Sequence, residues 1–340
     1  MTNSGPVSSS EAHALAQRID VSALHGASLA IVGGSGMVGN YFCHALCQVA
    51  EIQGYRPKSL SILNRRPASP EQGWAKSFPY VAVSNLQVSF GMEIPSADFF
   101  GHFASPASPS HYLSANDVWT ANLGPLVSAL TGTAVPDRTL FISSGEVYGS
   151  HGSFSPSEDD PVNFQSGGTR SWYPNAKIAA EQILSVANAS NITRGVSARL
   201  FHSFGPGVRR DDGRSFADFL WAAAAGKPIK LYSSGTQVRS FAYLEDTTVG
   251  LWIAMTGNHR FTTLNVGGTE VLSVLDFARV VGEVAGVSVE TNNAGEQSVR
   301  TESPIEATSP NLARLRNLGW SQKVPLREAV TRTIEFIRRQ

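Results

Sequence analysis

Short apolar runs alternate with longer segments of helical periodicity over the first two thirds of the chain. Continuous apolar runs are typical of buried parallel strands, whereas apolar residues three or four positions apart are typical of helices that pack on a sheet. The predicted strands lie at 29–32, 60–63, 80–83, 98–103, 138–143 and 195–200, and the predicted helices at 37–50, 114–130 and 173–187. This alternation predicts an α/β fold with a Rossmann-type doubly wound parallel sheet and helices on both faces.

The pattern changes after residue 204 to polar loops, a helix at 216–225 and short strands, and the chain closes with an amphipathic helix at 325–339. We therefore expect a smaller, interleaved C-terminal substrate domain. The expected division is an N-terminal extension (1–27, with a short helix at 11–20), a dinucleotide-binding domain (28–200 plus about 240–272) and a substrate-binding domain (201–239 plus 273–340).

Composition excludes several classes of partner. The 27 Lys and Arg residues balance the 27 Asp and Glu residues, so the formal net charge is +0. A protein that binds nucleic acid by neutralising phosphates needs an excess of positive charge, so we expect no nucleic-acid partner. No run approaches the ~20 apolar residues of a membrane span, and the first residues lack the charged and apolar regions of a secretory signal.

The two cysteines, Cys43 and Cys47, lie one helical turn apart among apolar residues. Two such cysteines do not make a disulfide framework, and no histidine or carboxylate partners cluster near them to hold a metal ion. We expect two buried thiols, no metal site and a reducing, cytoplasmic compartment.

A glycine triplet follows the first predicted strand directly and opens the next helix: Gly33, Gly36 and Gly39 form G-x-x-G-x-x-G. Glycine is needed where the backbone turns sharply and approaches a pyrophosphate, and the helix N-terminus offers unpaired N–H groups to that anion. The triplet alone is weak evidence, but its strand–turn–helix context predicts a dinucleotide site that includes Met37 and Val38.

The adenine-ribose end of this site is less regular. An acidic residue usually follows the second strand of an NAD site, but here the strand ends in Asn64, Arg65 and Arg66. The amide can bond the ribose hydroxyls of NAD, the arginines can bind the 2′-phosphate of NADP, or the two arginines are simply solvated on a loop. The cofactor therefore stays open between NAD and NADP, with Ala104 and Ser105 as further expected contacts.

A second motif, Tyr173-x-x-x-Lys177, places a phenol and an ammonium on one helix face. The ammonium, together with an oxidised nicotinamide, should lower the phenol pKa so that Tyr173 acts as a base. An exposed pair on an amphipathic helix is the alternative. Ser144 and Glu146 follow a strand at its carboxyl end, where ligands of such sheets bind. Ser144 is expected to bond the reacting hydroxyl.

These motifs, with Phe204-Gly205-Pro206, occur in an order that resembles the extended short-chain dehydrogenase/reductases. That family comprises nucleotide-sugar epimerases, dehydratases and decarboxylases, and the resemblance covers roughly residues 29–338. Several segments look most similar to UDP-glucuronate decarboxylases, namely 102–109, 198–201, 212–214, 235–241 and 318–320.

The resemblance implies roles for particular residues. Ser144, Tyr173 and Lys177 match the catalytic triad. Glu146 matches a carboxylate found in decarboxylases and 4,6-dehydratases but not in simple 4-epimerases. The expected substrate-binding residues are Ser105, Glu146, His202, Arg214, Tyr232 and Arg239.

Three positions depart from the family pattern. Gly145 stands where dehydratases carry an aspartic acid and decarboxylases often a serine, His202 where an asparagine usually meets the substrate, and Asn64 where the ribose ligand is acidic. The first departure concerns the second chemical step, and the others concern substrate and cofactor choice.

The sequence therefore predicts an enzyme that oxidises a nucleotide-diphosphate sugar at C4 to a 4-keto intermediate and recycles a tightly bound cofactor. Decarboxylation of a UDP-glucuronate-type substrate is favoured, because Gly145 offers no acid for a leaving hydroxyl and Glu146 argues against plain epimerisation. The alternatives are a 4,6-dehydratase, a 4-epimerase, and a non-catalytic dinucleotide-binding sensor or scaffold.

The same resemblance implies a homodimer that pairs the helices at 114–130 and 173–187. An apolar stripe on the first of these helices would suit such an interface; it comprises Val118, Leu123, Leu126, Val127 and Leu130. The alternative is that this stripe packs only on its own sheet.

Overall fold

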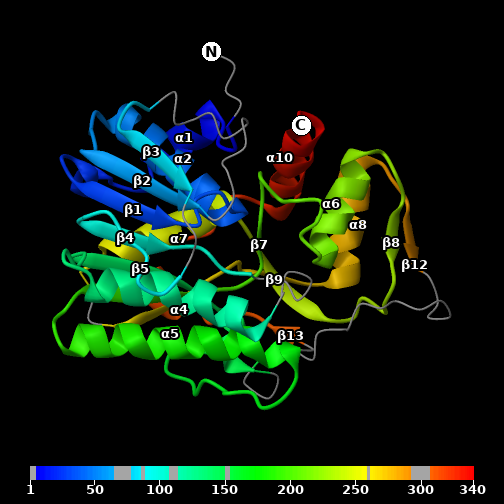
Figure 1. Cartoon of the computed structure of the whole chain (residues 1–340). Coiled ribbons are helices and arrows are strands. Elements are labelled where there is room, and N and C mark those ends of the chain that lie inside the picture. Colours follow the sequence, from blue (N-terminus) through cyan, green and yellow to red (C-terminus); the bar gives the residue numbers. More distant parts are fainter. Residues whose placement is uncertain are drawn as a thin grey trace.

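A parallel sheet of seven strands, in the order β10-β6-β5-β4-β1-β2-β3, forms the centre of the larger part of the molecule (Figure 1). The strands are β1 (Ser28–Val32), β2 (Ser59–Asn64), β3 (Val81–Asn85), β4 (Phe99–His102), β5 (Arg138–Ser144), β6 (Arg194–Leu200) and β10 (Thr263–Val266). The computed structural model describes residues 5–64, 78–85, 89–106, 114–149, 154–258, 261–291 and 307–340. The six predicted strands are all present; the apolar pattern did not single out β10.

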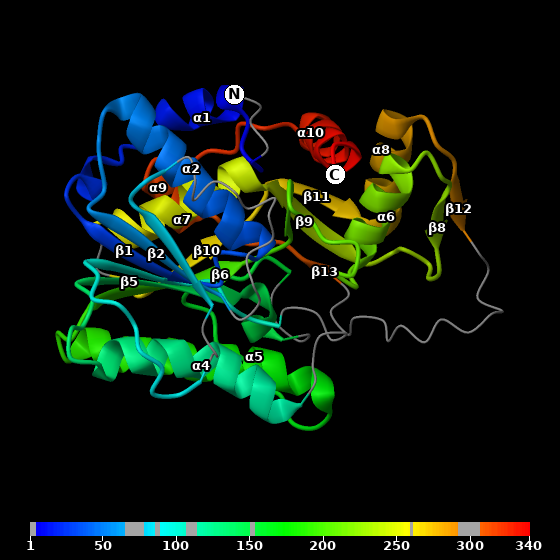
Figure 2. The same ribbon diagram turned by 45° about the horizontal axis from the view of Figure 1, so that its top comes forward.

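Helices cover both faces of this sheet, which confirms the predicted fold class (Figure 2). One face carries α1 (Ser9–Ala16), α2 (Met37–Gln53), α7 (Leu244–Thr256) and α9 (Ala313–Asn317). The other carries α4 (Ala115–Thr131) and α5 (Trp172–Ala189). The helix ends follow local chemistry: the Ser114 side chain accepts a hydrogen bond from the Asp117 N–H at the start of α4, and Gly54, with φ +75°, ends α2.

Two apolar layers sandwich the sheet. All five residues of β1 are buried, as expected for a strand covered on both faces. Ile31 and Phe42 belong to the layer under α2 and α7, whereas Phe100, Leu126 and Leu184 belong to the layer under α4 and α5.

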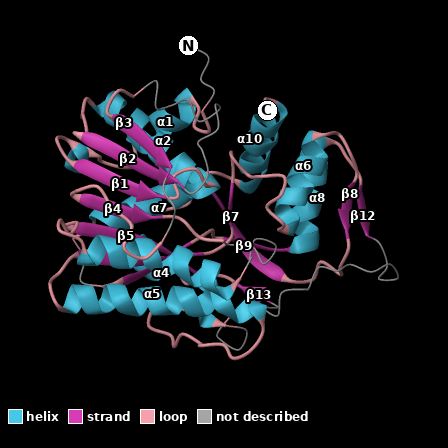
Figure 3. Ribbon diagram, in the orientation of Figure 1, coloured by secondary structure: helices cyan, strands magenta, loops and turns pink. Residues whose placement is uncertain are grey.

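The second group of elements lies beside the sheet and is built around β9 (Val238–Tyr243) (Figure 3). Its other elements are β7 (Ser203–Phe204), α6 (Ser215–Ala224), β8 (Ile229–Leu231), β11 (Glu270–Ser273), α8 (Val274–Ala285), β12 (Val289–Thr291), β13 (Ala307–Thr308) and α10 (Leu326–Arg338). Strand β9 lies between β11 and β13 and also pairs with β7, while β8 pairs with β12 at the outer edge. The core is aromatic, with Phe241 and Phe277 stacked at 4.1 Å between ring centroids.

The division into domains remains a proposal, and the two apolar cores support most of it. Val330 and Ile334 of α10 pack in the core of the second group. Leu315 and Trp320, which precede them, pack instead in the core beneath α2 and α7.

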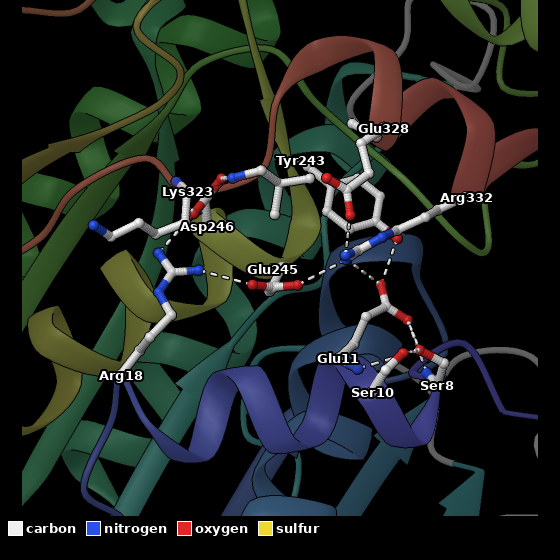
Figure 4. Close-up of polar contacts among 12 residues, drawn as sticks. Ser8, Ser10, Glu11, Arg18, Tyr243, Glu245, Asp246, Lys323, Glu328 and Arg332 are labelled. Carbon is white, nitrogen blue, oxygen red and sulfur yellow. Dashed lines mark hydrogen bonds and ion pairs between the residues drawn. The ribbon is translucent and has the colours of Figure 1, made fainter. Parts of the chain in front are cut away.

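The N-terminal segment is packed into the molecule and joins its two parts. Leu15 and Leu24 are buried in the core under α2 and α7. The Glu11 carboxylate, 4% exposed, accepts a hydrogen bond of 2.6 Å from the Tyr243 hydroxyl (Figure 4). It accepts another of 3.1 Å from the Tyr41 hydroxyl. Arg332 of α10 lies 3.6 Å from the same carboxylate. Side chains of α2, β9 and α10 therefore meet at the buried carboxylate of Glu11 in α1.

Two further findings concern compartment and membrane. Cys43 and Cys47 are both buried free thiols on α2. Within the part of the chain that the structure describes, no helix is long and apolar enough to cross a bilayer.

Candidate active site

The predicted functional residues gather at the carboxyl edge of the parallel sheet. Strand β6 ends at Leu200, and β7, which belongs to the second group, begins at Ser203. The carboxyl ends of the central strands therefore face the second group. Open α/β sheets bind their ligands at this edge.

The glycine triplet forms a tight turn in which two of the three glycines have no room for a side chain. At Gly33 (φ +86°) a Cβ would stand 2.4 Å from the backbone N of Ala104, and at Gly39 it would stand 2.5 Å from the Gly33 oxygen. At Gly36, which precedes α2, the nearest atom would be 3.4 Å away. No side chain caps the first turn of α2. This open space before a helix N-terminus fits a pyrophosphate, so the residues present fit a dinucleotide.

Asn64, the predicted ribose ligand, makes a contact that the sequence did not suggest. Its side chain is 1% exposed, and its Oδ1 accepts a hydrogen bond of 3.0 Å from the Ser35 N–H. The amide thus holds the glycine turn, and its contact with ribose stays a prediction. Arg65 and Arg66 lie outside the described residues.

Ala104 and Ser105 follow β4 at the same edge. The Ser105 hydroxyl donates to Asn122 Oδ1 at 2.9 Å, and the Asn122 amide donates to the Val118 carbonyl at 2.7 Å. Asn122 is fully buried. Ser105 is therefore fixed from α4, next to the Ala104 backbone that packs on Gly33.

The predicted triad is assembled. Ser144 is the last residue of β5, and its side chain hydrogen-bonds the Tyr173 phenol. Tyr173 and Lys177, one turn apart on α5, are 6% and 1% exposed. The Lys177 ammonium donates to the Ile142 carbonyl at 2.5 Å and lies 5.5 Å from the centroid of the Tyr173 ring. The alternative of an exposed surface pair is therefore wrong.

Burial is the largest influence on the pKa of both Tyr173 and Lys177. Burial raises the pKa of Tyr173 above its ordinary value, the charge of Glu146 raises it further, and the hydrogen bond with Ser144 opposes both. Burial also lowers the pKa of the Lys177 ammonium to about 7, against the opposing charge of Glu181. Burial therefore dominates the pKa of both groups, and the activation of Tyr173 by Lys177 together with an oxidised nicotinamide stays a prediction.

Glu146 lies within the influence of three arginines. Burial raises the pKa of its carboxyl group, and the charges of Arg170, Arg239 and Arg214, in decreasing order, oppose that rise. Arg239 is 5% exposed on β9, so its charge is held inside the protein. Arg214 is also paired with the Asp212 carboxylate, whose Oδ1 accepts a hydrogen bond of 2.5 Å from Arg214 Nε, so the three arginines exceed the two carboxylates by one positive charge, which suits an anionic ligand.

Arg170 was missed by the sequence analysis. It lies in the short 3₁₀ helix η5 (Thr169–Ser171) directly before α5. A residue three positions before Tyr173 shares its face of a continuing helix, and that spacing was the available signal.

Two other predicted substrate residues behave differently. Burial, followed by the charges of Arg239 and Arg214, lowers the pKa of His202 to about 3, so its imidazole is neutral beside the arginines. Tyr232 follows β8 at the outer edge and is 53% exposed. The structure thus brings His202 to the arginine group and leaves Tyr232 on the surface.

Phe201 explains the unusual glycine between Ser144 and Glu146. A Cβ at Gly145 would stand 2.8 Å from two atoms of the Phe201 ring. A side chain at position 145 would therefore overlap this aromatic ring.

Comparisons with known proteins agree with this geometry. The model of the NAD dependent epimerase/dehydratase family matches residues 29–267. The chain therefore belongs to the NAD dependent epimerase/dehydratase family, a class of enzymes whose cofactor is NAD.

Two relatives are more specific. The chain is 29% identical over 242 residues to UDP-glucuronic acid decarboxylase 1 of Xenopus tropicalis, covering 70% of this chain and 56% of the relative. It is 30% identical over 248 residues to UDP-glucuronic acid decarboxylase 4 of Arabidopsis thaliana, covering 70% and 54%. The chain thus spans little more than half the length of these relatives.

Solved structures confirm the fold. A UDP-glucose 4-epimerase from Thermotoga maritima is similar with a TM-score of 0.73 and 16% identity, covering 92% of this chain and 99% of that one. A UDP-glucuronic acid 4-epimerase from Bacillus cereus, in complex with UDP-glucuronic acid and NAD, has a TM-score of 0.73, 20% identity and the same coverage.

Proposed function

We propose that this protein is an NAD-dependent nucleotide-sugar decarboxylase that acts on a UDP-glucuronate-type substrate. The observation that carries the proposal is the group of Arg170, Arg214 and Arg239 around Glu146, beside the Ser144–Tyr173 contact. A nucleotide-diphosphate sugar acid brings a diphosphate and a carboxylate, and guanidinium groups suit both anions.

The residues that hold the cofactor in this proposal are those of the glycine turn and the adjoining strand ends. Gly33, Gly36 and Gly39, with Met37 and Val38 in the first turn of α2, surround the open space for the pyrophosphate. NAD, when bound, supplies a hydride acceptor that returns the hydride after the sugar has reacted, and its oxidised ring adds a positive charge.

The chain's own residues move and hold protons. In its phenolate form, Tyr173 Oη would take the proton of the sugar C4 hydroxyl and return it when the ketone is reduced, and Ser144 Oγ, already hydrogen-bonded to Tyr173, would orient that hydroxyl. Lys177, with a pKa of about 7, supplies positive charge beside the phenol at neutral pH. Once C4 is a ketone, the C6 carboxylate is that of a β-keto acid, so its bond to C5 breaks with release of carbon dioxide, and C5 takes up a proton.

We prefer decarboxylation to dehydration because position 145 carries no acidic side chain and the Phe201 ring occupies the adjoining space. Elimination of a C6 hydroxyl needs an acid that protonates the leaving group. The Phe201 ring fills the position from which such an acid would act. Loss of carbon dioxide needs no such acid.

Mass spectrometry of the products tests the proposal. Purified protein with NAD and UDP-glucuronate should release carbon dioxide and yield the corresponding UDP-pentose. The Tyr173→Phe variant should keep NAD and lose at least about 10²-fold in turnover. Loss of water from a UDP-hexose, a change of configuration at constant mass, or binding without any turnover would favour the dehydratase, the epimerase or the non-catalytic protein instead.

We also propose a homodimer and a cytoplasmic location. Four of the five residues of the predicted α4 stripe are buried against the protein's own sheet or α5, so that stripe does not carry the proposal. Support comes from α5, where Trp172, Ile183 and Val186 are partly or fully exposed on one helix face. Ile183→Glu should convert a dimer into a monomer in analytical ultracentrifugation.

The buried free thiols of Cys43 and Cys47 support a reducing compartment, and hence the proposed cytoplasmic location.

A further inference from the structure

A buried ion pair lies behind the catalytic side of α5. Glu181, one turn after Lys177, is 4% exposed, and Arg199 of β6 is 5% exposed. Glu181 Oε2 accepts a hydrogen bond of 2.7 Å from Arg199 Nη2, and Oε1 accepts one of 3.0 Å from Nε. Arg199 therefore binds the carboxylate through two roughly parallel hydrogen bonds, a bidentate arrangement that is the strongest geometry for such a pair.

The Glu181 carboxylate also reaches the strand that carries Ser144. Its Oε1 accepts a hydrogen bond of 2.5 Å from the hydroxyl of Ser143, the preceding residue of β5. Ser143 is 2% exposed and is the register partner of Arg199 in the sheet. One carboxylate thus ties α5, which bears Tyr173, to β5.

Arg199 extends the connection to the segment that carries Glu146. Its Nη1 donates to the Tyr148 hydroxyl at 2.8 Å, and its guanidinium lies 4.8 Å from the centroid of that ring. Tyr148 ends the 3₁₀ helix η4 (Gly145–Tyr148), and its hydroxyl donates to Asn265 Oδ1 at 2.8 Å. Ser144 of β5 and Glu146 of η4 are therefore both held, through neighbouring residues, by the Glu181–Arg199 pair.

We propose that Glu181 is a positioning residue for the reaction, which fixes Ser144 against Tyr173 through Ser143 and places a buried negative charge one helical turn after Lys177. This inference rests on the proposed function for its catalytic meaning, although its structural part does not. A buried ion pair is a poor source of stability compared with apolar packing, so its presence beneath the site points to this role.

The charges around Lys177 support the second part. Burial lowers the pKa of the Lys177 ammonium to about 7, and the Glu181 carboxylate opposes that fall. Tyr173 faces the ammonium from the same helix, the Phe141 ring lies 4.7 Å away on β5, and His102 faces it from β4. Burial, followed by the charge of Lys177, lowers the pKa of His102 to about 3, so His102 is neutral. Glu181 is therefore the negative group that acts on Lys177.

The Glu181→Gln variant tests the inference, because it keeps the shape of the side chain and removes its charge. The Lys177 pKa is measured by NMR with a carbon-13 label at lysine Cε, assigned with Lys177→Met. We expect a fall of about one pH unit or more. In the active enzyme the alkaline limb of the kcat profile should move down by the same amount, with about ten-fold less activity at pH 8. Glu181→Asp keeps the charge and should restore the pH profile.

Glu245→Gln is the matched control, since Glu245 is 2% exposed, also pairs with arginines, and lies in the cluster around Glu11. An unchanged Lys177 pKa in Glu181→Gln, or an equal shift in Glu245→Gln, overturns the inference. If Glu181→Gln does not fold, the double variant with Arg199→Met leaves no unpaired buried charge, and its Lys177 pKa must still be lowered. If the wild-type protein turns over no nucleotide sugar, the proposed function fails, while the NMR titration still decides the charge of Lys177.

Discussion

The backbone of Ala104 lies where a side chain at Gly33 would have to go. A Cβ at Gly33 would stand 2.4 Å from the Ala104 nitrogen, and its φ of +86° is unfavourable for any other residue. Gly36, in the same turn, has its nearest atom, the Gly33 oxygen, 3.4 Å from the Cβ position, and its φ is negative. The same motif therefore contains one glycine required by the fold and one that leaves room for a ligand.

Gly36→Ala should change the free energy of unfolding by less than about 0.5 kcal/mol, because the nearest atom to the added methyl group, the Gly33 oxygen, would be 3.4 Å away. It should weaken NAD binding on the order of ten-fold or more, because the methyl occupies the space before α2. Calorimetric titration with NAD and chemical denaturation measure the two effects. Gly33→Ala is the comparison and should lose stability first. Equal NAD affinity in Gly36→Ala and wild type would refute the assignment of this space to the pyrophosphate.

Gly145→Asp should destabilise the protein by about 1–3 kcal/mol, because its Cβ would overlap the Phe201 ring. Denaturant unfolding measures the cost. Phe201→Leu alone is the control. The double variant should lose less unfolding free energy than the two single variants lose together, because the two side chains compete for one space. A fully stable Gly145→Asp protein would show that the ring moves aside easily, which would remove the argument against dehydration.

The sequence predicted the elements that depend on local patterns. All six predicted strands are present in the central sheet. Ser144 at the end of β5 and Tyr173 near the start of α5 also lie together, as their positions in these elements imply. Contacts between remote segments were not predictable in this way. Tyr243 and Glu11 are 232 positions apart and meet only after both parts have packed. Likewise, the burial that raises the pKa of Tyr173 depends on the packing of remote segments, which the Tyr-x-x-x-Lys spacing does not reveal.

Stability should fall as the pH drops below about 6.5, partly because of His44. Burial lowers the pKa of this imidazole from 6.5 to about 3. Between these two values the unfolded chain therefore binds a proton at His44 that the folded protein does not bind. This destabilisation of the folded protein is absent above pH 6.5. It grows as the pH falls towards 3, by up to about 1.4 kcal/mol of unfolding free energy per pH unit. Denaturant unfolding from pH 7.5 to pH 4.5 gives the slope. His44→Leu should reduce this slope by nearly one proton, and an unchanged slope would contradict the prediction.

Glu11→Ala should cost about 3–5 kcal/mol, because it removes the acceptor of two buried tyrosine hydroxyls and the charge beside Arg332. Glu328→Ala is the matched control. Glu328 also pairs with Arg332, but its side chain is 48% exposed, so its loss should cost at most about 1 kcal/mol. Because Glu11 joins the N-terminal segment to Tyr243 and α10, its removal should also raise amide hydrogen exchange in α10 more than in the central sheet. Equal costs for the two variants would mean that the buried acid does not hold the two parts together.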